Sequence, residues 1–176
     1  ITRAHLRVRG REALEWWAGR LRESNIANSG VGERDGRLVL DFEDPEGQRL
    51  SLVDGGGHGD PPQSWDKSPV PAEHQVRGLG PIVMSVPTLG PTDSVLTRVA
   101  NMRRVREYAG AGHPPHTVHV YSMGKGGPHA ELHVAVEPGL GQARLGAGGV
   151  HHVAFRTPTV EEYHAWADRL NTLGAP

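Results

Sequence analysis

Two stretches of the sequence align without a gap: RAHLRVRGREALEWWAGRL at residues 3–21 and HVAFRTPTVEEYHAWADRL at residues 152–170. Each begins with a short strand-like run. In each, apolar residues then recur three and four positions apart, which is typical of an amphipathic helix. The same strand–helix unit is therefore predicted at both ends of the chain. The identical pairs are Arg7 and Arg156, Glu12 and Glu161, Trp17 and Trp166, Ala18 and Ala167, Arg20 and Arg169, and Leu21 and Leu170.

A fainter copy of the unit lies at residues 80–102, GPIVMSVPTLGPTDSVLTRVANM. Strand-like runs follow the first two copies, at 29–33, 37–43 and 48–54 and again at 105–108, 116–122 and 129–136. The turn DPEG at 44–47 predicts a hairpin, because Pro45 presets φ and Gly47 can adopt positive φ. Each of the first two units is therefore predicted to be β-α-β-β-β.

These units divide the chain into an α+β protein with curved mixed sheets. The first unit is expected at 1–54 and the second at 77–137, with linkers rich in glycine and proline at 55–76 and 138–148. Residues 149–176 supply only the strand and helix of a third unit, which indicates a truncated chain. A lone strand and helix cannot pair their edges or bury their apolar face, so we expect this piece to dock on a further module or on another subunit. A homo-oligomer is therefore one expected assembly.

Composition excludes several classes of function. The formal net charge is −1 and no run of lysine or arginine occurs, which argues against a nucleic-acid partner. No apolar run approaches the length of a membrane span, and no leader pattern opens the chain. The sequence has 0 cysteines, which excludes disulfides, thiolate metal sites and a cysteine nucleophile. A cytoplasmic protein is expected.

The tandem units resemble the vicinal oxygen chelate superfamily, which contains glyoxalase I, extradiol ring-cleaving dioxygenases and bleomycin-resistance proteins. The subgroup that the chain resembles most is that of the four-module ring-cleaving dioxygenases of the hydroquinone type. Aligned with that subgroup, the chain corresponds to modules 2 and 3 and to the start of module 4. The stretches that carry the resemblance are ALEWWAGRL at 13–21, LDFEDPEGQRLSLVD at 40–54, VRGLGPIVMSV at 76–86 and GAGGVHHVAFRT at 146–157.

The resemblance implies a metal site that this sequence contains only in part. In such proteins two modules form a cup around one divalent metal, held by a histidine from the first strand of each module and a carboxylate from a fourth strand. The motif H-x-x-hydrophobic places His152 at the ligand position. The equivalent positions hold Arg3 and Pro81, and the carboxylate positions hold Ser51 and His133. The resemblance therefore implies that modules 2 and 3 form a cup without metal, and that the other ligands lie outside this sequence.

Strand alternation separates the two adjacent histidines. Neighbouring residues of a strand face opposite sides, so His152 and Arg156 are predicted to share one face and His151 the other. Arg156 is therefore either a pocket-lining residue or a partner in a structural salt bridge.

Two further histidines have a spacing that could suggest zinc. His129 and His133 lie four residues apart, as in zinc-binding helices, but ELHVAV at 131–136 predicts a strand, which would hold them about 13 Å apart. A metalloprotease is therefore excluded, and His5 is expected to line the cup without binding metal.

The expected function of the intact protein is metal-dependent, extradiol-type cleavage of an aromatic diol such as a hydroquinone, with O2 as the second substrate. The expected metal is Fe(II), with Mn, Zn and Ni as alternatives. Two other functions remain open: a glyoxalase-like isomerase or lyase, and a non-catalytic protein that binds small molecules, as resistance proteins do. The chain alone is expected to be inactive, because one imidazole is too few for a metal site.

Overall fold

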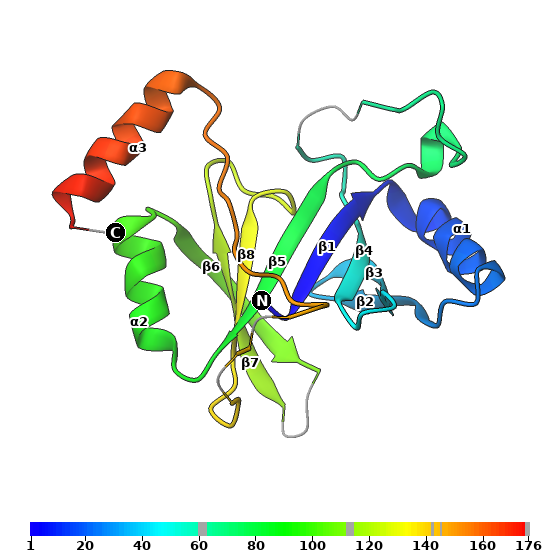
Figure 1. Cartoon of the computed structure of the whole chain (residues 1–176), viewed down its shortest axis with the longest axis horizontal. Coiled ribbons are helices and arrows are strands. Elements are labelled where there is room, and N and C mark those ends of the chain that lie inside the picture. The colour runs from blue at the N-terminus through cyan, green and yellow to red at the C-terminus, as the bar shows by residue number, and fades with distance from the viewer. Residues whose placement is uncertain (60–62, 112–114, 142, 145, 175–176) are drawn as a thin grey trace.

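The computed structural model describes residues 1–59, 63–111, 115–141, 143–144 and 146–174 (Figure 1). The first half contains β1 (Arg3–Val8), α1 (Gly10–Glu23), β2 (Asn28–Arg34), β3 (Arg37–Glu43) and β4 (Arg49–Asp54), followed by the short 3₁₀ helix η1 (Ala72–His74). The second half contains β5 (Leu79–Val86), α2 (Leu89–Ser94), β6 (Arg103–Gly110), β7 (His116–Ser122) and β8 (Glu131–Val136). Helix α2 continues into the π-helical turn η2 (Val95–Val99), and α3 (Val160–Thr172) is the last described element.

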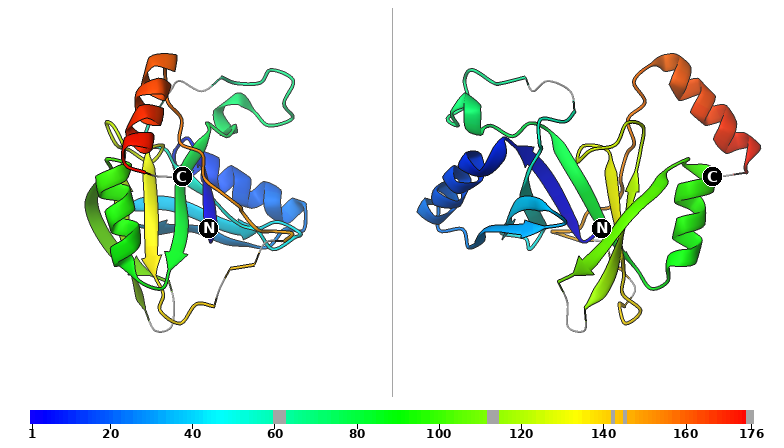
Figure 2. Two further views of the ribbon diagram at one scale, coloured as in Figure 1. Left: turned by 60° about the vertical axis from the view of Figure 1, so that its left-hand side comes forward. Right: turned by 180° about the vertical axis from the view of Figure 1, so that it is seen from behind.

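One mixed sheet of eight strands, in the order β2-β3-β4-β1-β5-β8-β7-β6, runs through this part of the chain. In each half the first strand pairs in parallel with the last, β1 with β4 and β5 with β8. The halves meet where β1 pairs antiparallel with β5. The strongly curved sheet lies between α1 and α2 (Figures 1 and 2). The predicted α+β class with a curved mixed sheet is confirmed, and the order β-α-β-β-β occurs twice.

Helix α1 covers one half of the outer face of the sheet, and α2 with η2 covers the other. Leu14 and Leu21 of α1 pack against Leu40 and Leu52 of β3 and β4, and Leu96 of η2 belongs to a second cluster with residues of β5, β7 and β8. The apolar positions of these strands alternate with polar ones, so polar side chains lie on the inner face of the sheet. The two cores therefore leave the inner face free to hold charged groups.

The turn at residues 44–47 joins β3 and β4 as the sequence predicts. Gly47 has a φ of 83° in the turn between β3 and β4. The Asp44 carboxylate accepts hydrogen bonds from the backbone N–H groups of Glu46 and Gln48, each at 2.9 Å. The predicted hairpin is confirmed.

The strand predicted before the last helix is absent from the structure. Residues 151–157 have no strand hydrogen bonding, although α3 forms and is capped by Thr159, whose side chain accepts the Glu162 N–H at 3.1 Å. The predicted strand was wrong because a strand exists only with a pairing partner, and no described strand pairs with this stretch.

Helix α3 lies beside the end of η2 (Figures 1 and 2). Its Arg169 donates hydrogen bonds to the backbone carbonyls of Arg98 at 2.7 Å and Val99 at 3.1 Å. No residue of α3 is buried, and Tyr163 is 59% exposed. No helix in the described part of the chain combines the length and apolar character that crossing a membrane requires.

Candidate functional site

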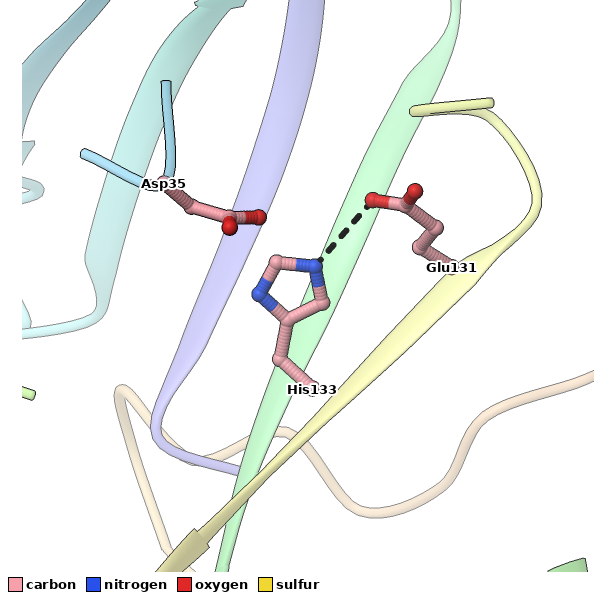
Figure 3. Close-up of side chains that lie close together, drawn as sticks. All are labelled: Asp35, Glu131 and His133. Carbon is pink, nitrogen blue, oxygen red and sulfur yellow. Dashed lines mark hydrogen bonds and ion pairs between the residues drawn. The ribbon is translucent and has the colours of Figure 1, made fainter. Parts of the chain in front are cut away.

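The inner face of the sheet carries a buried cluster of charged side chains. Glu131 and His133 project from β8 on the side opposite the core residues Leu132 and Val134, as strand alternation requires. Asp35 comes from the turn between β2 and β3, where it adopts a positive φ of 53°. In Figure 3 the imidazole of His133 lies between the two carboxylates.

Two arginines bind these carboxylates. Arg37 donates to both oxygens of Glu131, at 2.6 and 3.1 Å. Arg106 also donates to both oxygens of Glu131, each at 2.9 Å, and its Nε donates to Asp35 at 2.9 and 3.0 Å. Bidentate contacts between guanidinium and carboxylate are among the strongest ionic contacts in proteins. The two negative charges therefore face two fixed positive charges.

The histidine of the cluster is held from both sides. His133 Nε2 lies 3.3 Å from a Glu131 oxygen, and His133 Nδ1 lies 3.0 Å from the hydroxyl of Tyr108 on β6. Burial raises the pKa of Tyr108 to about 12, so its hydroxyl stays protonated at neutral pH. Tyr108 thus fixes the ring orientation of His133 without adding a charge.

Charge pairing shifts the acid–base equilibria of the cluster. Burial by itself would raise the pKa of Glu131, but the hydrogen bonds from its partners and the adjacent guanidinium charge lower that pKa well below its usual range. Hydrogen bonds to Asp35 and Glu131 raise the pKa of Arg106. At neutral pH Glu131 is therefore a carboxylate and Arg106 a guanidinium cation.

The donor set matches a metal site in composition but not in charge. One ligand atom each from Asp35, Glu131 and His133 lie within 4.8 Å of one another. Two carboxylates and one imidazole suit a divalent cation. Arg37 and Arg106 already neutralise both carboxylates, however, and a metal ion would have to displace them. The residues present therefore do not fit a metal ion.

A small pocket lies beside the cluster on the same face. His5 of β1 is buried there, and its Nδ1 donates to the Pro81 carbonyl at 2.8 Å. Burial lowers the pKa of His5 to about 3, so the ring is neutral. The predicted position of His5 on the wall of the cup is confirmed. The pocket is lined by His5, Arg34, Asp35, Arg37, Val39, Val53, Pro81, Tyr108 and His133.

Arg3 and Ser51 stand at positions where a metal cup of this family would carry ligands, and both contact Asp41 instead. Arg3 lies 3.2 Å from the Asp41 carboxylate and donates to the Leu50 carbonyl at 3.0 Å. The Ser51 hydroxyl donates to the same carboxylate of Asp41, and Arg34 pairs with it as well. A second ion-pair cluster therefore occupies the face where a metal cup would place its ligands.

The predicted metal ligand and the predicted pocket residue lie in the irregular stretch before α3. His152 is exposed, and its Nδ1 lies 3.2 Å from that of His151. The expected separation of these two histidines onto opposite faces was wrong, because the stretch forms no strand. Arg156 is also exposed. His152 is not in the group of ligand atoms formed by Asp35, Glu131 and His133. The assignments of His152 as a metal ligand and of Arg156 as a pocket residue stay predictions.

Sequence reasoning identified His133 and His5 as residues of the inner face but did not predict Asp35, Glu131, Arg37 or Arg106. A usable signal was present: charged or polar residues alternate with apolar ones in ELHVAV at 131–136. The pairing of Arg37 with Glu131 spans 94 residues, and no local pattern indicates it.

Two β-α-β-β-β units joined edge to edge in one curved sheet are the vicinal oxygen chelate fold, and the chain has this fold. A solved structure from Bacillus subtilis, of a protein named as a dioxygenase, superposes with a TM-score of 0.79 at 22% identity, covering 99% of this chain and 52% of that chain. Glyoxalase I from Zea mays superposes with a TM-score of 0.53 at 12% identity, covering 78% of this chain and 43% of that chain. No family model matches the sequence.

Curated homologues carry the names of ring-cleaving dioxygenases. MhqA of Bacillus subtilis (strain 168), named as such an enzyme, is 38% identical over 94% of this chain and 52% of its own length. The chlorohydroquinone/hydroquinone 1,2-dioxygenase of Sphingobium indicum is 28% identical over 92% of this chain and 49% of its own length. The chain spans about half the length of the curated relatives it matches.

Proposed function

We propose that the chain is part of a metal-dependent, extradiol-type dioxygenase that cleaves the ring of an aromatic diol or hydroquinone with O2. The observation that carries the proposal is the 38% identity to a relative named as a ring-cleaving dioxygenase, over 94% of the chain. The fold alone does not identify this chemistry, because glyoxalase I has the same fold. The proposed setting is the cytoplasm, with the two halves of the sheet as modules 2 and 3 of a four-module protein and residues 149–176 as the start of the fourth.

We propose His152 as one of three protein ligands to the metal, with Fe(II) as the preferred ion. When bound, such a metal binds both oxygens of the substrate and O2. His152 supplies one imidazole from an exposed stretch, and the clusters of the inner face supply no vacant ligands to it. The proposal therefore requires the other ligands to come from residues outside this chain.

The test is oxygen uptake by the complete protein with hydroquinone and substituted hydroquinones, with and without added Fe(II). The wild-type protein is expected to consume O2 and form a ring-opened product. Replacing His152 with Ala is expected to lower the rate by about 100-fold or more, because a direct ligand matters at least as much as groups that merely orient one.

His151→Ala is the matched control, since it removes the neighbouring imidazole and is expected to retain activity. Substrate conversion without O2 consumption would replace the dioxygenase with an isomerase or lyase of the same fold. Binding without turnover would indicate a sequestering protein. Full activity of His152→Ala would overturn the ligand assignment while leaving the reaction class in place.

A further inference from the structure

The charged cluster connects the two edges of the sheet. Strand β2 is at one end of the strand order and β6 at the other, so six strands lie between them. Nevertheless Asp35, in the turn that follows β2, is bound by Arg106 of β6. Arg37, at the start of β3, likewise reaches Glu131 of β8. The sheet is therefore curled so far that side chains from its opposite edges meet on the inner face.

Arg106 lies at the centre of this contact. Its guanidinium donates hydrogen bonds to both Asp35 and Glu131 and so joins the two carboxylates. A planar guanidinium with five N–H donors can bind two carboxylates at once with fixed geometry. A divalent metal ion that bound one oxygen of Asp35 and one of Glu131 would join the two carboxylates in the same way.

We propose that the guanidinium of Arg106 is the built-in cation of this cup, taking the place of a divalent metal between Asp35 and Glu131 and fastening the two edges of the sheet together. The cup formed by this chain then binds no metal, whatever metal the complete protein holds elsewhere. The inference does not depend on the proposed function, because it concerns only residues that this structure places in contact.

The first test is a titration of the wild-type chain with Mn(II), Ni(II) and Zn(II), followed by calorimetry. Any binding by the wild type is expected to be unchanged in Glu131→Gln, because the cluster does not contribute to it. Metal binding that disappears with Glu131→Gln would overturn the proposal.

The second test replaces Arg106 with Met, which keeps an unbranched apolar stem and removes the charged guanidinium. Asp35 and Glu131 then lack their shared cation, so the variant is expected to melt about 10 °C lower than the wild type. It is also expected to gain a divalent-metal site whose occupancy restores part of the lost melting temperature. Adding Asp35→Asn to this variant should abolish the gained site.

Arg103→Met is the matched control, because Arg103 is an exposed arginine of the same strand. It is expected to leave both melting and metal binding unchanged. If Arg106→Met does not fold, Arg106→Lys is tested in its place, since it keeps a positive charge at this position. A folded Arg106→Lys that binds no metal supports the proposal that a cation of the protein takes the place of the metal. A folded Arg106→Met with the wild-type melting temperature and no metal binding contradicts the proposal.

Discussion

Replacing Glu131 with Gln is expected to lower the free energy of unfolding by about 3 kcal/mol at pH 7. Glu131 is 3% exposed at its side chain and neutralises two guanidiniums, those of Arg37 and Arg106. A neutral amide can accept hydrogen bonds from them but cannot balance their charge. Removing one partner of a buried ion pair leaves the other partner's charge uncompensated in a poorly solvated place. The arginines keep some contact with water, which places the estimate at the lower end of what such losses cost.

Urea unfolding of the two proteins measures this difference, and Glu43→Gln is the matched control. Glu43 pairs with Arg49 at 3.3 Å, but both side chains are more than half exposed. Exposed pairs contribute little, so the control should lose less than about 1 kcal/mol. A similarly small loss for Glu131→Gln would mean that water solvates the guanidiniums well enough to replace the carboxylate.

The difference in stability between the wild type and Glu131→Gln is expected to depend on pH. The folded-state pKa of Glu131 is lowered relative to its ordinary value of 4.5, so the unfolded chain takes up the proton first as pH falls. The stability supplied by Glu131 is complete above about pH 4.5 and declines below it. The difference between wild type and Glu131→Gln should therefore shrink in acid, as unfolding curves at pH 7 and pH 3.5 would show.

The β-α-β-β-β units were predictable because their signals are local. Alternating apolar residues, the DPEG turn at 44–47 and the apolar face of α1 each act over a few residues, and the structure bears them out. The strand expected around His152 has the same local pattern, yet it did not form. Pairing decides whether an alternating stretch becomes a strand, and pairing depends on segments distant in the sequence.

The charged cluster could be predicted only in part, for the same reason. Alternation along β8 places Glu131 and His133 together on one face. It does not predict that Asp35, 96 residues earlier than Glu131, lies across the cup from them, since that depends on the curl of eight strands. Arginines also resemble ordinary surface residues in a sequence. Their role as partners of buried carboxylates emerges only from the folded geometry.

Lowering the pH from 6.5 to 5 is expected to cost the wild-type protein about 2 kcal/mol of stability through His5 alone. The folded-state pKa of His5 is lowered from 6.5 to about 3, chiefly by burial and to a smaller extent by His133, Arg34 and Arg3, while the hydrogen bond to the Pro81 carbonyl opposes this shift. Between these pKa values the unfolded chain binds a proton that the folded chain excludes. Stability is therefore complete above about pH 6.5 and is lost progressively as the pH falls toward 3.

His5→Gln tests this assignment, because an amide can still donate to the Pro81 carbonyl but does not titrate. Its stability should change less between pH 6.5 and 5 than that of the wild type, by about 2 kcal/mol in urea unfolding. His164→Gln, which removes an exposed imidazole from α3, is the matched control and should retain the wild-type slope. If His5→Gln keeps that slope as well, protons enter the folded cup at His5 and the ring is not as isolated from water as its burial indicates.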